Sequence, residues 1–341
     1  MITLEQRIAS FSSLGKVFEI ASSGVDNNLG ALIDKLKAHN GWFTPENVRF
    51  ALSNWASLLK EINLRNWVSS YSFVDQNPKT IGIIMAGNIP MVGFHDLLCV
   101  LISGNKAKVK LSSKDNVLMA EIIHTLLKIQ PAWSSYIQIE EGPMKDFQAV
   151  IATGSDNSAR YFDYYFGKYP HIIRKNRTSV AILTGNEQSN DLQQLGWDIF
   201  RYFGLGCRNV TKLYVPDQYD FTMFFDAISV FRFVLENNKY ANNYDYNKAV
   251  FLLNKTPHLD NGFLLLREDA ALFTPAALIN YQTYTNQQEL QEMISTQKEA
   301  IQCCLGNQKD FNCLPFGSSQ SPDLFQYADG VDTMQFLVGL S

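Results

Sequence analysis

Residues 80–111 read TIGIIMAGNIPMVGFHDLLCVLISGNKAKVKL and begin a regular alternation of strand-like and helix-like stretches. Short β-rich runs bounded by turn residues are typical of buried strands, and a longer apolar stretch between two of them is typical of a helix. The stretch therefore predicts two parallel strands joined by a crossover helix. Its parts, in order, are a strand at 80–86, a turn at GNIP (87–90), a helix at 91–103 and a strand at KAKVKL (106–111).

The alternation continues downstream. The serines and the aspartate of SSKD (112–115) are typical of a helix start, so a helix is expected over 116–129. The whole pattern predicts an α/β fold with a doubly wound parallel sheet, in which ligands bind at the carboxyl ends of the strands. Further strands are expected at 136–141, 149–154 and 179–185, and a further helix at 191–204.

Different patterns flank this region. In the N-terminal part, Thr44 and Pro45 give an N-cap followed by proline at the first helical position. Apolar residues then recur at helical spacing, which predicts a core-facing stripe of Val48, Leu52, Trp55, Leu59 and Ile62. After residue 200, strands are expected at 211–216, 249–254 and 262–269, and an aromatic helical stretch at 220–238. The expected domains are an N-terminal helical region (1–75), a nucleotide-binding domain (76–200), a smaller α/β catalytic domain (201–320) and a C-terminal tail (321–341).

Composition and charge exclude several classes of function. The chain has 341 residues and a net charge of -4 without a long basic run, so nucleic acid is not an expected partner. No segment reaches about 18 uninterrupted apolar residues, and the first residues do not resemble a signal peptide, so we expect a cytoplasmic protein without membrane insertion. Five cysteines without C-x-x-C spacing and five scattered histidines argue against a disulfide framework and against a metal site.

A single cysteine stands in an unusual setting. In YFGLGCRNVTKLYVP (202–216), Cys207 lies between a glycine and an arginine, directly before a strand-like segment. A thiolate is a strong nucleophile, and flanking glycines allow a substrate carbonyl to approach it. The alternative is a buried structural cysteine. Small residues follow three other strands, but the chain has neither a G-x-G-x-x-G fingerprint nor a P-loop.

The order of these motifs resembles the aldehyde dehydrogenase superfamily. GNIP is followed by a strand ending in Lys110, a TGS turn (153–155), the GLGC motif with Lys212 five residues after its cysteine, and finally PFG (315–317). Within the superfamily, the chain is similar to the LuxC-type fatty acyl-CoA reductases. That similarity lies in the strings MAGNIPMVGFHDLL, IIRKNRTSVAIL and YADGVDTMQFL.

The resemblance implies an aldehyde dehydrogenase-like fold and assigns two catalytic residues. Cys207 matches the nucleophile that attacks the thioester carbonyl of an acyl-CoA; the CoA thiol leaves, and hydride from a nicotinamide then reduces the S-acyl enzyme to the aldehyde. Asn88 matches the asparagine whose amide forms an oxyanion hole with the backbone N–H of the cysteine. Without that role, Asn88 is an ordinary turn asparagine.

The resemblance also assigns a cofactor site. Lys110 matches the lysine at the adenosine ribose, Ser112 and Ser113 follow it at the strand end, and Gly154 and Ser155 match the turn beside the pyrophosphate. Many relatives that use NAD have an acidic residue where this chain has Ser113 followed by Lys114, so we expect NADPH and leave NADH open. The nicotinamide ribose is assigned to Glu268 or Asp269, because an extra ALF segment (271–273) obscures the match.

One departure from the superfamily bears on the reaction. Hydrolytic aldehyde dehydrogenases have a glutamate in E-L-G-G that activates water, and the corresponding stretch here is RKNR (174–177), so we expect slow hydrolysis and net reduction. Alternatives are an acyl-phosphate reductase, a cofactor-independent cysteine acyltransferase or thioesterase using His95 and Asp96, and a non-catalytic acyl-binding relative. The expected partner is the acyl-CoA substrate. A homodimer and acyl-transferring partner enzymes are compatible with the sequence.

Overall fold

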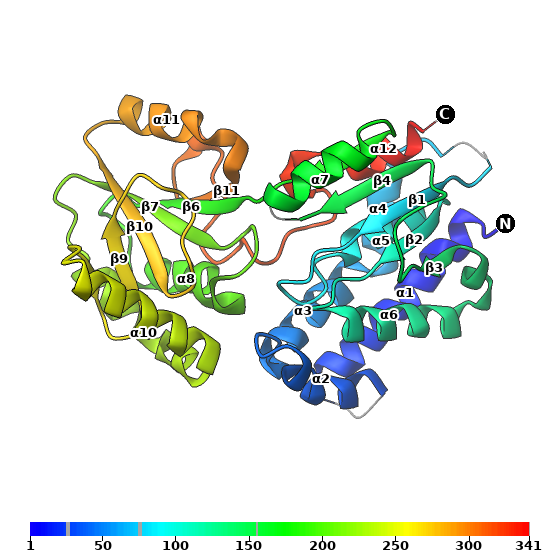
Figure 1. The fold of residues 1–341 in the computed structure, drawn as a ribbon, viewed down its shortest axis with the longest axis horizontal. Coiled ribbons are helices and arrows are strands. Elements are labelled where there is room, and N and C mark those ends of the chain that lie inside the picture. The colour runs from blue at the N-terminus through cyan, green and yellow to red at the C-terminus, as the bar shows by residue number, and fades with distance from the viewer. Residues whose placement is uncertain (25–27, 74–76, 155, 341) are drawn as a thin grey trace. The chain divides into compact units, whose positions relative to one another are not determined.

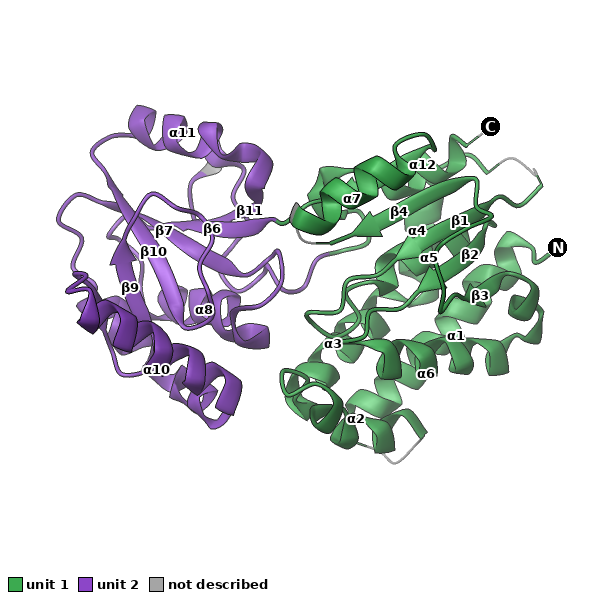
Figure 2. Ribbon diagram, in the orientation of Figure 1, with its two compact units in different colours: residues 1–176, 323–341 green, residues 177–322 purple. Residues whose placement is uncertain are grey.

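The computed structural model describes residues 1–24, 28–73, 77–154 and 156–340, which form two compact units (Figure 2). Unit 1 comprises residues 1–176 and 323–341, and unit 2 comprises residues 177–322. The sequence pattern predicted a domain change near residue 200 instead. The difference has a simple cause: β6 (Thr178–Ile182) pairs with β7 (Val210–Pro216), so the chain enters unit 2 before β6.

Unit 1 contains a five-stranded, fully parallel sheet in the order β3-β2-β1-β4-β5. Successive strands run outward from β1 to β3, and the chain then returns to the other side of β1 for β4. Such a reversal of strand order is the point at which doubly wound sheets bind ligands. The strands are β1 (Thr80–Ile84), β2 (Lys106–Lys110), β3 (Ile137–Ile139), β4 (Ala149–Thr153) and β5 (His171–Arg174).

Helices cover both faces of this sheet. Figure 1 shows α7 on one side and α1 and α6 on the other, which confirms the expected doubly wound arrangement. The helices are α1 (Leu4–Ser22), α2 (Asn28–His39), α3 (Pro45–Leu58), α4 (Glu61–Val68), α5 (Phe94–Ile102), α6 (Asn116–Ile129), α7 (Asp156–Phe166) and α12 (Thr333–Val338), with 3-10 turns η1 (Pro131–Ser135) and η6 (Ala328–Gly330).

Local sequence signals account for α3. The Thr44 hydroxyl accepts a hydrogen bond from the backbone N–H of Asn47, with Pro45 at the first helical position, as expected. Val48, Leu52 and Leu59 are fully buried. The prediction was wrong for Ile62, which is 72% exposed. Since α3 ends at Leu58 and α4 begins at Glu61, the helical spacing does not continue to Ile62.

Unit 2 contains a six-stranded sheet in the order β11-β6-β7-β10-β9-β8, in which only β8 runs antiparallel to its neighbour. Figure 1 shows α11 on one side of this sheet and α8 and α10 on the other. The other strands are β8 (Leu259–Asp260), β9 (Leu265–Glu268), β10 (Leu278–Tyr284) and β11 (Ile301–Leu305). The helices are α8 (Ser189–Phe200), α9 (Thr222–Ile228), α10 (Asn238–Leu253) and α11 (Gln287–Thr296), with 3-10 turns η2 (Arg201–Gly204), η3 (Ser229–Glu236), η4 (Lys298–Ala300) and η5 (Lys309–Phe311).

The prediction of a strand at 249–254 was wrong, because these residues form the end of α10 and its C-cap, Asn254. Tyr240, Tyr244, Asn247 and Phe251 recur at helical spacing and bury one face of this helix. Its start is capped by the Asn237 side chain, which accepts hydrogen bonds from two backbone N–H groups. The periodicity over the full helix therefore outweighs the strand-like composition of its last few residues.

Within the described ranges, every helix is too short or too polar to cross a lipid bilayer. The aromatic stretch at 220–238 divides into α9 and η3. Phe224 and Phe231 are fully buried there, whereas Phe233 is 49% exposed, so most of this stripe is core packing.

Candidate active site

The turn that carries Cys207 has an unusual backbone. Tyr202 and Phe203 have φ values of 55° and 59°, and Gly204 and Gly206 have φ values of 79° and 98°. Non-glycine residues in this region cost about 1–3 kcal/mol each and persist where the surrounding structure enforces them, often at functional sites. The half-buried Cys207 thiol follows directly, three residues before β7 begins. The chain therefore holds this thiol in a constrained turn, and the structure keeps all five cysteines as thiols.

The start of β6 fixes the same turn from the neighbouring strand. Ser179 donates its hydroxyl to the carbonyl oxygen of Cys207 at 3.1 Å, and Thr178 donates its hydroxyl to the carbonyl oxygen of Asn209 at 3.0 Å. The strand register between β6 and β7 shifts at this point, and such bulges often re-aim side chains beside active sites. No sequence motif points to Ser179 or Thr178, because their contacts with this turn depend on the pairing of β6 with β7.

A second cysteine and a buried carboxyl group lie close to this turn. Ser179 also contacts the sulfur of Cys303 at 3.0 Å, and burial raises the pKa of the Cys303 thiol above its usual value. Asp198 in α8 accepts hydrogen bonds from the backbone N–H of Ser319 at 2.9 Å and from its hydroxyl at 2.6 Å. Burial raises the pKa of Asp198 to about 6. Asp198 also accepts from the N–H of Gly317, so it ties the PFG motif to the helix that precedes Cys207.

The two candidate carboxylates differ in what they contact. Asp269 forms an ion pair with Arg267 at 2.9 Å and accepts a hydrogen bond from the N–H of Ala271 at 2.8 Å. Glu268 is exposed at the end of β9. The sheet register does not bring either residue beside Cys207: Glu268 pairs with Tyr281 of β10, which pairs with Leu213 of β7.

Buried polar side chains hold the loop after β9. Lys212, which has no exposed surface, donates its ammonium group to the carbonyl oxygen of Asp269. Asn280 donates to the carbonyl oxygen of Ala271 at 2.9 Å, and Thr211 donates to that of Leu272 at 2.6 Å. Burial lowers the pKa of Lys212 to about 8. Lys212 of the cysteine motif therefore supports a loop from inside the sheet.

In unit 1, the predicted catalytic residue Asn88 and the predicted cofactor residues follow strands at one edge of the sheet. Asn88 follows β1, Ser112 and Ser113 follow β2, and Gly154 follows β4, so all lie at the carboxyl ends of adjacent strands. Asn88 and Ser113 are exposed, and Ser112 and Gly154 are half-buried. Lys110 is half-buried at the end of β2 and donates to the carbonyl oxygen of Gly142 at 2.7 Å. Ser155 lies outside the described residues.

Two features hold the backbone at this edge in place. A Cβ on Gly87 would lie 2.6 Å from the Ser112 side chain, and a Cβ on Gly154 would lie 2.7 Å from the Cβ of Ser158, so only glycine fits at either position. Asp115 is 3% exposed and accepts a hydrogen bond from the N–H of Met91 at 2.9 Å. Met91 has a φ of 61°, so Asp115 anchors a strained position in the loop that follows Asn88.

The RKNR stretch begins with a buried arginine, while Lys175 and Asn176 are exposed. Arg174 is buried, forms an ion pair with Asp96 and donates to the Thr333 hydroxyl at 2.9 Å. The Asp96 carboxylate is therefore already paired with the Arg174 guanidinium. The neighbouring His95 stacks on Tyr327 with ring centroids 5.2 Å apart.

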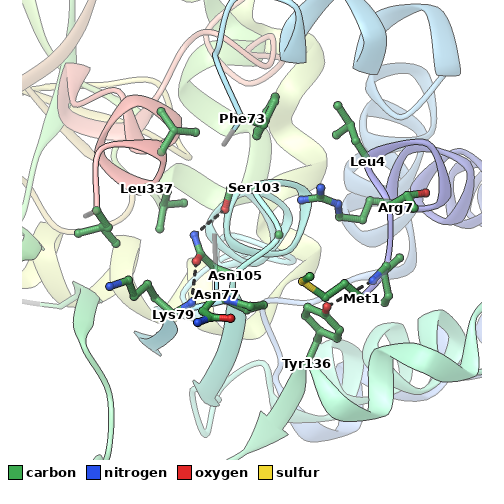
Figure 3. A pocket seen from close by; sticks show the side chains of 16 residues that line it. Met1, Leu4, Arg7, Phe73, Asn77, Lys79, Ser103, Asn105, Tyr136 and Leu337 are labelled. Atoms are coloured by element: carbon green, nitrogen blue, oxygen red, sulfur yellow. Dashed lines mark hydrogen bonds between the residues drawn. The ribbon is translucent and has the colours of Figure 1, made fainter. Parts of the chain in front are cut away.

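A cavity of about 540 Å³ lies at the opposite edge of the unit 1 sheet (Figure 3). Lys79 and Asn105, which directly precede β1 and β2, contribute to its lining and are joined by a 3.0 Å hydrogen bond. The cavity is thus separate from the edge that carries Asn88 and Lys110. Among the described residues, no cluster of three or more histidine, cysteine or acidic side chains is arranged to bind a metal.

Comparisons with known proteins bear on the family and the fold of the chain. The model of the acyl-CoA reductase (LuxC) family matches residues 25–229. No curated protein matches the chain.

Solved structures of aldehyde dehydrogenases share the fold. Aldehyde dehydrogenase 21 from Physcomitrella patens, in complex with succinate, is 11% identical to this chain with a TM-score of 0.68. The match covers 91% of this chain and 74% of the dehydrogenase. Glyceraldehyde-3-phosphate dehydrogenase GapN from Methanocaldococcus jannaschii, in complex with NADP, is 12% identical with a TM-score of 0.63. This match covers 91% of this chain and 77% of GapN. Indole-3-acetaldehyde dehydrogenase in complex with NAD+ is 14% identical with a TM-score of 0.62. This match covers 86% of this chain and 69% of that dehydrogenase. The expected aldehyde dehydrogenase-like fold is confirmed.

Proposed function

This chain belongs to the acyl-CoA reductase (LuxC) family, and from that premise we propose that it reduces a fatty acyl-CoA to the aldehyde through an acyl group carried on Cys207. Family and fold together make it an acylating enzyme of the aldehyde dehydrogenase type that depends on a nicotinamide cofactor. The observation that carries the assignment of Cys207 is its constrained turn, in which Tyr202 and Phe203 both have positive φ values.

The chain's own residues perform the acyl transfer. The Cys207 sulfur attacks the thioester carbonyl carbon, the carbonyl oxygen becomes an oxyanion, and CoA leaves as its thiolate when the oxyanion collapses. Asn88 is our candidate for the amide donor to that oxyanion; loss of one such donor costs about 3 kcal/mol in acyl transfer. Because RKNR replaces the stretch that carries the hydrolytic base, and Arg174 within it is tied to Asp96, water is poorly activated and the acyl group persists on Cys207.

The residues of unit 1 fit a nicotinamide dinucleotide. The N-terminal end of α7 follows Gly154 at the carboxyl end of β4, which is a favourable place for a phosphate group. Lys110 and Ser112 would hold the adenosine ribose. When bound, the cofactor supplies the hydride that converts the acyl group to the aldehyde.

We propose NADPH as the preferred form. Ser113 and Lys114 are both exposed at the end of β2, where a hydroxyl and an ammonium group can bind a 2′-phosphate. Asp115 is the nearest carboxyl group in sequence, but burial raises its pKa to about 8, so it is mostly uncharged at neutral pH and does not repel a phosphate.

The cofactor-independent hydrolase has less support. A Cys-His-Asp arrangement needs a carboxylate that orients the histidine. Asp96 instead pairs with Arg174, and His95 stacks on Tyr327. Both residues therefore have structural roles inside unit 1.

The deciding experiment measures NADPH oxidation by the purified protein with acyl-CoAs of several chain lengths. Cys207→Ala should abolish acyl-CoA-dependent oxidation, while Cys313→Ser, a half-buried thiol elsewhere in unit 2, should retain it. Oxidation that requires an acyl phosphate would assign the alternative reductase. Acyl-enzyme formation without oxidation of NADPH or NADH would replace the proposal with a cysteine acyltransferase.

A paired experiment tests the nicotinamide ribose assignment. Asp269 already contacts Arg267 and Ala271, so we propose Glu268 as the carboxylate that remains for the ribose. Glu268→Gln should raise the KM for the cofactor more than Asp269→Asn does. Equal effects, or none for Glu268→Gln, would remove Glu268 from the site.

A further inference from the structure

Two cysteines of unit 2 lie in direct contact. The sulfur atoms of Cys304 and Cys313 are 2.8 Å apart. A disulfide bond is about 2.05 Å long, so only a small movement separates these two thiols from bond formation.

The backbone supports this contact independently of the side-chain positions. Leu305 and Leu314, the residues after each cysteine, form a parallel β-bridge. The N–H of Leu314 donates to the carbonyl oxygen of Cys304 at 2.8 Å, and the N–H of Gly306 donates to that of Leu314 at 3.0 Å. Neighbouring strands lie about 4.8 Å apart, which falls within the range of Cα separations that disulfides span, about 4.4–6.8 Å.

The two thiols differ in exposure. Cys304 is 9% exposed, whereas Cys313 is half-buried at the edge of an apolar cluster that includes Val180, Tyr214 and Leu290. The pKa of Cys313 lies below its usual value because the Cys304 thiol can stabilise the ionised sulfur of Cys313 by a hydrogen bond. Cys313 is therefore the thiol that meets an oxidant first.

We propose that Cys304 and Cys313 form a redox pair that closes to a disulfide with a small-molecule disulfide such as oxidised glutathione as the oxidant. The Cys313 thiolate attacks one sulfur of glutathione disulfide and releases one glutathione thiolate. The Cys304 thiol then attacks the Cys313 sulfur of the mixed disulfide, and its proton leaves with the second glutathione. Two protein thiols are oxidised, and one glutathione disulfide is reduced to two thiols.

The position of Cys304 and Cys313 in unit 2 predicts how their disulfide affects stability and the Cys207 thiol. Cys304 packs in the cluster on the α11 face, whereas Cys303, the preceding strand residue, contacts Ser179 beside the Cys207 turn. The disulfide therefore forms on the opposite face of the sheet from the turn and leaves the Cys207 thiol reactive. It ties β11 to the segment that leads to Gly317 and Ser319, both of which bind Asp198. We expect a higher Tm for unit 2 in the oxidised protein.

The test equilibrates the full-length protein in glutathione buffers of increasing oxidised fraction, blocks the remaining thiols with iodoacetamide and maps peptides by mass spectrometry. All samples carry the Cys207→Ala substitution, so Cys207 cannot form a mixed disulfide. The readout is then independent of the proposed function, which needs Cys207. We expect a peptide joining Cys304 to Cys313, lost again with reduced dithiothreitol. Cys304→Ser should leave Cys313 as a glutathione adduct, and circular dichroism should confirm that this variant is folded.

Two results would overturn the proposal. One is that both cysteines stay fully alkylated in the most oxidising buffer. The other is that Cys313 links to a different cysteine while Cys304 remains a thiol. Either would show that the 2.8 Å contact does not lead to a bond.

Discussion

Replacing Asp115 by asparagine should stabilise the protein at neutral pH. Asp115 is 3% exposed, and among the described residues its carboxyl group accepts a single hydrogen bond, from the N–H of Met91 at 2.9 Å. Burial raises the pKa of this carboxyl group from 3.8 to about 8, with the Met91 hydrogen bond opposing the shift. Asparagine has nearly the same shape, keeps an acceptor for Met91 and carries no ionisable group.

The magnitude follows from proton linkage. In the unfolded chain the carboxyl group loses its proton near pH 4, whereas in the folded protein it keeps the proton until about pH 8. Between these values the folded state binds one more proton, so stability falls as pH rises, by slightly more than 1 kcal/mol per pH unit. By pH 7 the accumulated cost is about 4 kcal/mol. The asparagine NH2 group offsets about 1 kcal/mol of the gain because it needs a new partner.

The assay is urea unfolding, followed by circular dichroism, at several pH values between 5 and 8. The difference in unfolding free energy between Asp115→Asn and wild type should grow with pH and reach about 3 kcal/mol at pH 7. Asp163→Asn, at an exposed position of α7, is the control and should leave the pH dependence of wild type unchanged. If Asp115→Asn shows the same pH dependence as wild type, Asp115 is ionised in the folded protein and the reasoning fails.

Three further outcomes follow from packing and exposure. Asp96→Ala should lower the unfolding free energy by about 3–5 kcal/mol, because it leaves Arg174 buried without its carboxylate; a loss below 1 kcal/mol in urea unfolding would contradict this. Gly196→Ala should cost about 1–3 kcal/mol, because its Cβ would lie 2.2 Å from a phenylalanine ring, and an unchanged Tm would argue against it. Iodoacetamide should modify Cys207 before Cys99, which is fully buried with a raised pKa, and peptide mass spectrometry should detect that order; the reverse order would refute it.

The local structure of unit 1 could be predicted well from the sequence. The helix expected over 116–129 is found with those same ends, and the Thr44 cap starts α3 as expected. In both cases the signal is contained in neighbouring residues: helical periodicity, a cap, and a turn at each end. The strands at 80–86 and 106–111 were equally clear because turn residues bound them.

Features that depend on distant contacts could not be predicted in this way. A strand was expected at 249–254 because five of its six residues are apolar, whereas the buried positions along the whole of α10 show that it is helical. In the candidate site, the sequence predicted Cys207, and that prediction still awaits its test. The sequence could not identify Ser179, which holds the turn through pairing of β6 with β7, or the burial of Asp115.

Unit 2 is one continuous run of chain placed between the two parts of unit 1. Contacts that complete unit 1 come from its second part: Tyr327 accepts a hydrogen bond from the Trp67 indole at 2.8 Å, and Thr333 accepts one from Arg174. On the ribosome, unit 2 is therefore fully synthesised while unit 1 still lacks its last residues. Residues 1–176 cannot complete their packing until residues 323–341 are made, so a chain that stalls after residue 322 leaves unit 1 unfinished but has all of unit 2, including Cys207.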